Sequence, residues 1–345
     1  MTTQRLLAGD IGGTTTRLLL ARRENGATRV LAAQHFASRR YAGFAEVIAE
    51  FRREIPEGVL DSACFAVAGP VRRTTGAETV KVTNLPWSIA SNELAHSIGA
   101  VRLRLINDFE AVGYGIEGLN EQELAVLQAG VPERHGTRAV LGAGTGLGQA
   151  ILVWQGDHYA ILPTEGGHVD FGPTDPLQLE LARWLIRHDG RASYEDILSG
   201  VGLARVYAFL RERGLIPESP VVAAAIEQGD PAAAIITAAQ GRDPLASAAL
   251  DLFVTIYGAQ AGNLALAAGA TGGVYVAGGI APRILEKLRA GSFLAAFRAK
   301  GRMAGLLERI PLSVIVAPDV GLRGALAEAE RLLDEEPEAG HDQGC

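Results

Sequence analysis

A short turn near the N-terminus has the residue types of a phosphate-binding loop. It reads Gly9-Asp10-Ile11-Gly12-Gly13-Thr14 and lies between two apolar runs of strand length, a pattern that predicts a β-hairpin with a tip made mostly of backbone. Successive glycines allow backbone N–H groups to converge on an anion. Asp10 repels phosphate, but its carboxylate can hold a divalent cation, directly or through water. The turn therefore predicts a site for a phosphate group and its metal ion.

A second turn of the same kind follows roughly one domain length later. The stretch Gly142–Gly148, with Gly144, Thr145 and Gly146 at its centre, is again flanked by apolar runs of strand length. The repeat predicts a duplicated phosphate clamp, although each turn by itself is also typical of an ordinary tight hairpin. Neither turn ends in the Gly-Lys-Ser/Thr of a P-loop, and a strand rather than a dinucleotide-binding helix is expected after each.

Asn107 and Asp108 stand where a predicted strand, 101–106, gives way to a predicted helix, 109–119. Open α/β folds bind their ligands at such strand ends. Asp108 is equally well placed as the N-cap of that helix, a structural role that leaves its carboxylate able to react. The sequence alone leaves both interpretations open.

Two further segments carry polar side chains that suit ligand binding. Glu165 and His168 lie in a segment rich in glycine and proline that holds no cysteine or second histidine, so recognition of hydroxyl groups is favoured over metal binding. Ser193-Tyr194-Glu195-Asp196 resembles a capping box at a helix start, where Glu195 can also act as a simple first-turn acid.

A glycine pair, Gly278-Gly279, ends a predicted buried strand that begins at Val274. Bare backbone of this kind can accept a flat adenine ring. The alternative is a strand-to-helix turn that matters only for packing.

Strands and helices that must position these residues are indicated by apolar periodicity along the rest of the chain. Further strands are expected over 30–36, 62–68, 79–83, 158–162 and 313–317. Helices are expected over 44–51, 89–98, 177–185, 203–210 and 322–333, with short helices over 214–245 and another helix from about residue 282. A polar segment, 120–137, is a candidate domain joint, and residues 335–345 are expected to form a disordered tail.

Composition sets the class of protein. With 345 residues, 48% of them hydrophobic, the chain is long enough for about two well-packed domains, and its net charge of −7 disfavours nucleic acid and anionic membranes as partners. Cys64 and Cys345 cannot build a disulfide framework or a zinc cluster. The uncharged stretch from Leu252 to Pro282 contains two glycine pairs, so we expect a buried helix and strand there rather than a membrane span. No signal peptide precedes the first strand, so a cytoplasmic location is expected.

Taken together, the motifs resemble those of bacterial glucokinase, a family of the hexokinase and actin-like ATPase superfamily. The resemblance extends over nearly the whole chain and rests on Gly9–Thr14, Thr83-Asn84, Ile106–Phe109, Gly142–Gly148, Glu165–Phe171, Leu198–Gly200 and Ala277–Ile280. It implies an α/β fold of two duplicated ribonuclease-H-like domains of the actin-like ATPase and hexokinase type with an interdomain cleft. The small domain would comprise residues 1–118 and about 318–345, with the C-terminal helix returning to it, and the large domain residues 119–317.

The resemblance also implies a reaction, the ATP-dependent phosphorylation of glucose at its 6-hydroxyl to give glucose 6-phosphate and ADP. Asp108 would be the general base, and the sugar would be held by Asn84, Asn107, Asp108, Glu165, His168 and Glu195. ATP would be bound by Gly9, Asp10, Ile11, Gly12, Gly13, Thr14, Gly144, Thr145, Gly146, Gly278 and Gly279. Asp10 would hold Mg²⁺ through water, and a homodimer is the expected assembly.

One position departs from the family pattern, since Thr15 stands where many relatives carry Asn. A hydroxyl group can still donate, so we expect altered nucleotide affinity rather than loss of activity. The cysteine-rich zinc motif and the DNA-binding helix pair of neighbouring sugar kinases and repressors are missing from the sequence. Two alternatives are kept open: another hexose or aminosugar kinase, and a sugar or nucleotide sensor without catalysis.

Overall fold

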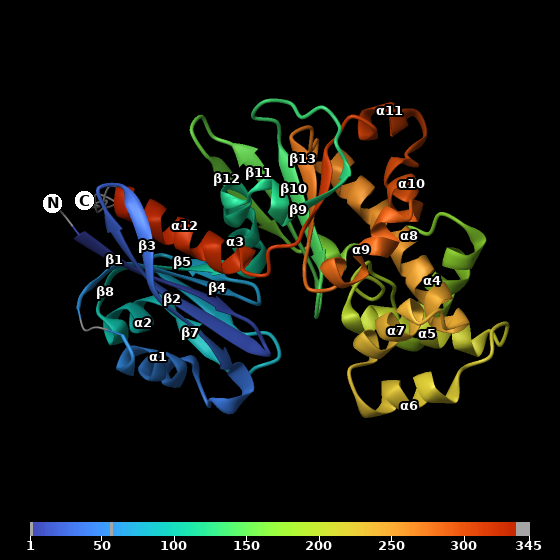
Figure 1. The fold of residues 1–345 in the computed structure, drawn as a ribbon, viewed down its shortest axis with the longest axis horizontal. Helices are drawn as coiled ribbons and strands as arrows, with labels where there is room; N and C mark the ends of the chain where they lie inside the picture. The colour runs from blue at the N-terminus through green and yellow to red at the C-terminus, as the bar shows by residue number, and fades with distance from the viewer. Residues whose placement is uncertain (1–2, 56–57, 336–345) are drawn as a thin grey trace, which may run out of the picture. The chain divides into compact units, whose positions relative to one another are not determined.

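The computed structural model describes residues 3–55 and 58–335, which form two compact units. The first unit runs to Gly118 and resumes at Asp319, and the second comprises Leu119–Pro318. Each unit is built on its own mixed β-sheet, as the ribbon in Figure 1 shows.

The first unit contains a five-stranded sheet in the order β3-β2-β1-β4-β8. Its strands are β1 (Thr3–Ile11), β2 (Thr15–Glu24), β3 (Ala27–Ala37), β4 (Leu60–Val67) and β8 (Ala100–Asn107). Strands β1, β2 and β3 form an antiparallel meander, and β4 is parallel to both β1 and β8. The hairpin predicted around the first glycine turn is confirmed.

Both faces of this sheet are apolar and both are covered by helices. Along β1, Leu7 and Ile11 belong to the core under α1 (Phe44–Arg53) and α2 (Ser91–Ile98), whereas Leu6 and Ala8 face α3 (Asp108–Gly115) and α12 (Val320–Asp334). Alternation of side chains along a strand explains why neighbouring residues enter different cores.

Glycines allow α3 and α12 to pack closely. A Cβ atom at Gly324 would collide with the carbonyl oxygen of Ala111, and one at Gly115 would collide with that of Val320. Helix α12 therefore lies against the helix that starts at Asp108. A small antiparallel sheet of β5 (Arg72–Thr74), β6 (Ala77–Lys81) and β7 (Ser88–Ala90) completes the unit.

The second unit repeats the plan of the first sheet and adds one strand. Its order is β12-β11-β10-β13-β14-β9, with an antiparallel meander of three strands followed by two parallel partners. The strands are β9 (Leu124–Gln128), β10 (Arg138–Ala143), β11 (Leu147–Trp154), β12 (Tyr159–Thr164), β13 (Gly273–Ala277) and β14 (Leu312–Ile315). The second predicted hairpin, β10 with β11, is thus confirmed, and the duplication extends to whole sheets.

Helices fill most of the remaining second unit. They are α4 (Pro176–Asp189), α5 (Gly200–Glu212), α6 (Pro220–Gln228), α7 (Pro231–Gln240), α8 (Pro244–Ala268), α9 (Leu285–Arg289), α10 (Ser292–Arg298) and α11 (Ala304–Leu307). Three of them begin with an aspartate cap followed by proline, at Asp175, Asp230 and Asp243, a pairing that starts helices well. The uncharged stretch is the buried α8 followed by β13, as predicted.

Several expectations need correction. Ile89 lies in β7 rather than in a helix. The segment 120–137 does follow the boundary between the units at Gly118, but it also contains a strand, β9, which pairs with β14. The helix expected from residue 282 is broken into short pieces, with a positive φ at Gly291. The predicted tail, apart from Glu335, lies outside the described residues.

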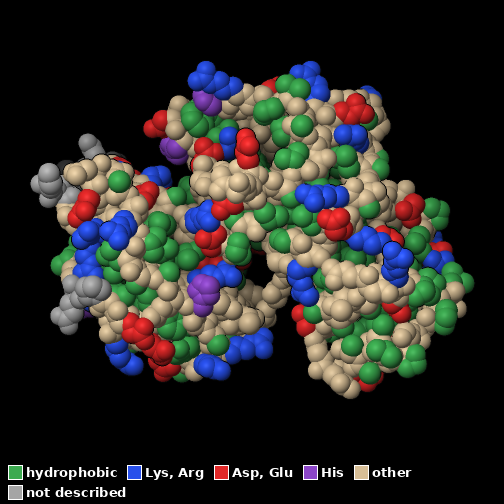
Figure 2. All heavy atoms as spheres, viewed as in Figure 1, with side chains coloured by type: hydrophobic (Ala, Val, Ile, Leu, Met, Phe, Trp, Pro, Cys, Tyr) green, Lys and Arg blue, Asp and Glu red, His purple; other side chains and the backbone are tan. Residues whose placement is uncertain are grey.

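Two expectations drawn from composition can be compared with the structure. Over residues 3–55 and 58–335, no helix is both long and apolar enough to cross a membrane. Figure 2 shows acidic and basic side chains interspersed on the visible face. Cys64 is a buried thiol on β4, and Cys345 lies outside the part of the chain that the structure describes.

Candidate active site

The first glycine turn is the tip of the β1–β2 hairpin. Ile11 pairs with Thr16, which leaves the residues between them at the tip. Ser38, from the end of the neighbouring strand β3, donates its hydroxyl to Gly12 O over 2.8 Å and its backbone N–H to Thr14 O over 2.9 Å. Because these carbonyls are already bonded, the tip can present N–H groups to an anion. The sequence interpretation missed Ser38, since nothing in its surroundings points to the turn.

Asp10 lies on β1 just before this tip and pairs with Arg17 on β2. Arg17 Nη1 donates to Asp10 Oδ2 over 3.0 Å. Burial raises the pKa of Asp10, and the Arg17 guanidinium partly offsets this shift. Gly321, at the start of α12, lies so close that a Cβ there would be 3.8 Å from the Asp10 carboxylate.

The side chains around Asp10 suit a weakly held magnesium ion better than a closed metal cage. Among the described residues there is no group of three or more His, Cys, Asp or Glu that could hold a metal. Mg²⁺ commonly keeps several waters and is bound through one or two carboxylates together with the phosphates of its nucleotide. Asp10 fits that role, because it is a single carboxylate beside a turn that can bind phosphate.

Two loops, one after β4 and one after β6, lie beside the first turn. Ile11 O accepts the N–H of Ala68 over 3.0 Å, and Ala68 O accepts the N–H of Thr83 over 2.8 Å. A Cβ at Gly13 would lie 3.5 Å from the Cβ of Asn84, so the predicted sugar-binding Asn84 lies against the predicted phosphate turn. Asn84 has φ +63°, a left-handed conformation that asparagine tolerates better than most residues.

Asn84 also borders a hollow of the first unit of about 560 Å³, a size suited to a small ligand. The hollow is lined mainly by the small sheet and by the loop that joins β6 to β7, through Pro70, Arg72, Thr79, Val80, Lys81, Val82, Thr83, Asn84, Leu85 and Ser88.

Asn107 and Asp108 are held at the junction of β8 and α3. Asn107 is the N-cap: its Oδ1 accepts Phe109 N–H over 2.9 Å, and its Nδ2 donates to Gly69 O over 3.1 Å. The alternative that Asp108 is the N-cap is therefore wrong, and Asp108 is the first helical residue. There the positive end of the helix dipole favours an ionised carboxylate. The signal that could have assigned the cap is the Asn-x-x-Glu spacing from Asn107 to Glu110, which forms a capping box.

The second glycine turn is the tip of the β10–β11 hairpin, where Ala143 pairs with Leu147. Gly144 N–H bonds to Gly146 O within the tip, and Gly144 O accepts Gly200 N–H, both over 2.8 Å. The structure thus brings Gly200, at the start of α5, to a turn 56 residues earlier.

The pair Gly278-Gly279 lies beside this second turn. Ile280 N–H donates to Ala143 O over 3.2 Å, and Gly278 has φ +83° with no room for a Cβ against Ala143 O. A residue other than glycine would be strained and would clash at 278, whereas a Cβ at Gly279 would meet nothing within 4 Å. The predicted nucleotide-binding glycines of the second unit therefore form one continuous backbone surface.

Glu165, His168 and Glu195 come together in the second unit, and we call these three residues the acidic cluster. His168 Nε2 lies 3.9 Å from Glu165 Oε2, and His168 Nδ1 lies 3.7 Å from Glu195 Oε1. Backbone bonds hold the segments together, because Gly167 O accepts Glu195 N–H over 2.9 Å. The Glu165 and His168 side chains are exposed, at 69% and 56%, and so are accessible to a ligand.

Glu195 does not begin a helix, contrary to the capping-box interpretation. Ser193 and Asp196 do exchange the expected hydrogen bonds, but they do so in a turn, and α5 begins only at Gly200 with Ser199 as its N-cap. Burial opposes ionisation of Asp196, but hydrogen bonds from Ser193 and the charge of Arg205 lower its pKa overall. Glu195 therefore lies in a turn and not in a helix, and its Oε2 accepts the backbone N–H of Leu147 over 2.8 Å.

Each unit therefore carries a glycine turn able to bind phosphate and polar side chains able to bind hydroxyl groups. The first unit adds a carboxylate at a helix start, Asp108, and a second carboxylate, Asp10, for a cation. Such a set of groups can support transfer of a phosphoryl group to an alcohol, a reaction that depends mostly on positioning and on neutralising charge.

Comparisons with known proteins agree with this chemistry. The model of the family Glucokinase matches residues 7–332. A Glucokinase of Nostoc punctiforme is 42% identical over 342 residues, which cover 95% of this chain and 99% of the relative. A Glucokinase of Trichormus variabilis is 44% identical over 344 residues, with the same coverage.

Among solved structures, a glucokinase from an Antarctic psychrotroph superposes with a TM-score of 0.81 at 30% identity, covering 95% of this chain and 99% of the other. A ROK family glucokinase from Streptomyces griseus, solved in complex with glucose and AMPPNP, has a TM-score of 0.63 at 19% identity over 95% of this chain and 99% of its own, which shows a common fold. The expected α/β fold of the actin-like ATPase type is thereby confirmed.

Proposed function

The chain belongs to the glucokinase family, and from this premise we propose that Asp108 is the general base of its reaction. As a member of that family the protein is a kinase that transfers a phosphoryl group from ATP to glucose. The observation that carries the proposal is the placement of Asp108 at the start of α3, next to Asn107, whose side chain is held by Gly69 and Phe109.

In the proposed step Asp108 accepts the proton of the glucose 6-hydroxyl while O6 attacks the γ-phosphorus. The bond between that phosphorus and the β–γ bridging oxygen breaks, and ADP leaves with the electron pair. General base catalysis of this kind contributes about 10²- to 10⁴-fold. Asp108 is the first residue of α3, where the positive end of the helix dipole is favourable for a negative charge.

The remaining site residues divide into two proposed groups. Asn84, Asn107 and the acidic cluster would hold the sugar hydroxyls, an arrangement that can reject an analogue lacking one hydroxyl by about 10⁴-fold. The two glycine turns would bind the phosphates and Gly278-Gly279 the adenosine. Asp10 would hold Mg²⁺ through water, and the ion supplies positive charge to the phosphates when bound.

Asp108→Asn tests the base. We expect kcat to fall at least about 100-fold, while glucose binding measured by calorimetry changes little, because the amide keeps the shape and loses the proton acceptor. Asp175→Asn is the matched control, since Asp175 starts a helix of the second unit and Asn is an equally good N-cap. Near-normal turnover in Asp108→Asn would show that the base lies elsewhere.

A panel of sugars tests the substrate. We expect ADP release with glucose and Mg²⁺, and little release with aminosugars or without the metal. Sugar binding without ADP release would favour the sensor alternative, and a preference for another hexose would favour the related kinase.

We also propose that the enzyme acts in the cytoplasm as a homodimer, in the first step of glycolysis.

A further inference from the structure

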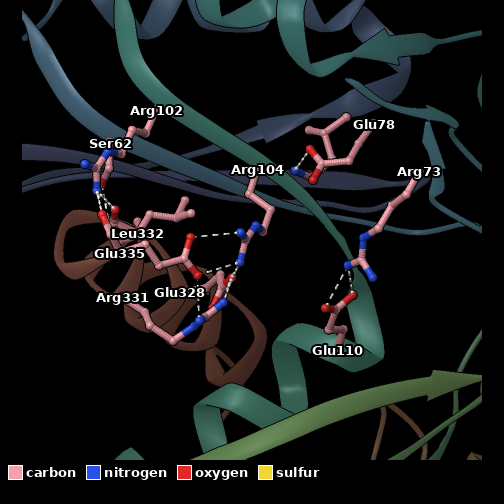
Figure 3. Close-up of polar contacts among 12 residues, drawn as sticks. Ser62, Arg73, Glu78, Arg102, Arg104, Glu110, Glu328, Arg331, Leu332 and Glu335 are labelled. Atoms are coloured by element: carbon pink, nitrogen blue, oxygen red, sulfur yellow. Dashed lines mark hydrogen bonds and ion pairs between the residues drawn. The ribbon is translucent and has the colours of Figure 1, made fainter. Parts of the chain in front are cut away.

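An ion pair between a half-exposed arginine and a buried carboxylate lies in the same helical turn as the proposed base. Glu110 on α3 is almost fully buried, with its side chain 5% exposed, and both of its carboxylate oxygens accept hydrogen bonds from Arg73 Nη2, over 3.0 and 3.1 Å. Figure 3 shows the Arg73 side chain pointing from its strand toward the first turn of the helix. Arg73 belongs to β5, so the pair joins the small sheet to α3.

Glu110 also completes the structure that fixes Asp108. Its Oε2 accepts the backbone N–H of Asn107 over 3.4 Å, which closes the capping box at the start of α3. One carboxylate therefore contacts both the residue before the proposed base and a strand of the small sheet.

A second contact fastens the small sheet to the same strand end. Glu78 on β6 accepts the backbone N–H of Leu105 on β8 over 3.1 Å. The chain that leaves β6 leads within a few residues to Asn84, which lies against the first glycine turn. Arg73 and Glu78 thus hold together the part of the first unit that carries Asn84 and the part that carries Asp108.

The charge of Arg73 matters because Glu110 is buried. Burial raises the pKa of Glu110, and Arg73 is the strongest influence that opposes this rise. Without the arginine, the buried carboxylate of Glu110 would keep only the Asn107 N–H, and a buried charge that has lost its ionic partner is destabilising. The carboxylate would then be expected to move or to take up a proton, and the capping box would loosen.

We propose that Arg73 and Glu110 are positioning residues for phosphoryl transfer, which hold Asp108 and the Asn84 loop in the arrangement that the reaction needs. The proposal rests on the proposed role of Asp108. Neither residue is expected to touch a substrate, and the pair acts through the Asn107 cap and the small sheet.

The test compares kcat and KM for Arg73→Ala, Glu110→Gln and the double variant. A small misplacement of a reacting group is costly, so we expect Arg73→Ala to lower kcat on the order of 10-fold, with the KM for ATP within about twofold of the wild type. Glu110→Gln keeps an oxygen that can accept the Asn107 N–H, and we expect a smaller loss. The double variant should be no slower than Arg73→Ala, because the two residues act as one unit.

Two further variants separate positioning from folding. Arg73→Lys keeps a single cationic nitrogen able to bridge both oxygens and should restore most of kcat. Arg331→Ala is the matched control, because Arg331 binds another buried carboxylate of the same unit, Glu328, through two contacts of 2.8 Å. It should lower thermal stability and leave kcat unchanged.

Unchanged kcat in Arg73→Ala overturns the proposal, as does an equal loss of kcat in Arg331→Ala. Failure of this proposal can be told apart from failure of the base assignment. If Asp108→Asn abolishes turnover while the Arg73 and Glu110 variants remain fully active, only the positioning role is wrong. If Asp108→Asn stays active, the base assignment itself is wrong.

Discussion

Glu195 accepts the backbone N–H of Leu147 over 2.8 Å, although 48 residues separate the two in sequence. Leu147 closes the second glycine turn, and Glu195 belongs to the acidic cluster. A single hydrogen bond therefore joins an element proposed to bind phosphate to one proposed to bind sugar, which makes the two substrates' binding sites mechanically dependent on each other.

Substitution of Glu195 should consequently affect both substrates. Glu195→Ala removes the acceptor for Leu147 N–H and the sugar contact, so we expect the KM for glucose and the KM for ATP each to rise about 10-fold, the equivalent of one lost hydrogen bond to a charged group. Glu195→Gln retains an acceptor oxygen and should raise mainly the KM for glucose. Steady-state kinetics in both substrates measure this, with the exposed Glu227→Ala as a control. An unchanged KM for ATP in Glu195→Ala would contradict the coupling.

Two glycines of the second turn should respond differently to alanine. A Cβ at Gly146 would lie 2.5 Å from Glu195 Oε2, whereas one at Gly144 would meet nothing within 4 Å. We therefore expect the Gly144→Ala variant to fold normally and bind glucose normally, with a raised KM for ATP. We expect Gly146→Ala to weaken the binding of both substrates. Calorimetry with glucose distinguishes the two variants. Equal glucose affinity in the two variants would show that the Glu195 side chain can move aside for the new Cβ atom without weakening glucose binding.

The pair of Asp10 and Arg17 should make stability depend on pH. The pair stabilises the ionised carboxylate, so its contribution is present at neutral pH and is lost as the pH falls through the pKa of Asp10 and the carboxyl group takes up a proton. Because burial raises that pKa, the loss begins at a higher pH than for an exposed aspartate. Arg17→Ala should cost about 1 kcal/mol at pH 7, and the difference from the wild type should be smaller at pH 4, where more of the Asp10 carboxyl group is protonated.

Denaturant unfolding at the two pH values measures the effect. Lys287→Ala, which breaks an exposed pair with Asp251, provides the control and should show little difference at either pH. A constant gap between Arg17→Ala and the wild type from pH 7 to pH 4 would mean that Arg17 stabilises the fold through something other than Asp10.

The buried Glu328 should be important for stability and not for turnover. Its carboxylate is fully buried and pairs with Arg104 and Arg331, as Figure 3 shows. Glu328→Ala leaves both arginines without this partner, and we expect a loss of about 3 kcal/mol in the free energy of unfolding. Glu330→Ala on the same helix should change it by less than about 0.5 kcal/mol. A lower kcat of Glu328→Ala, measured at temperatures where the variant is still folded, would contradict this expectation.

Local patterns in the sequence predicted the elements whose structure depends on near neighbours. Both hairpins, α1 and α12 follow from apolar spacing and turn residues, because these set the backbone within a few positions. The grouping of Glu165 with His168 was predictable for the same reason. The resemblance to a family added the roles of distant residues such as Asp108, which no local pattern assigns.

Residues that act across long sequence separations could not be predicted. Arg73 carries no local signal in the sequence, and only the folded chain brings it to the buried Glu110. Ser38 and Arg17 are equally inconspicuous, because their partners are fixed by strand register rather than by spacing. The strand β9 was missed for a similar reason, since its polar flanks conceal the pairing with β14 that holds it.

The return of α12 to the first unit has a consequence for synthesis of the protein. Leu322, Ala325 and Ala329 cover the face of the sheet that includes Leu6 and Cys64, yet they are synthesised only after the second unit, Leu119–Pro318. In the nascent chain, one apolar face of the N-terminal sheet therefore stays uncovered until the entire second unit has been translated. During that interval the growing chain is a natural client for chaperones, and premature termination before α12 would yield a polypeptide prone to aggregation.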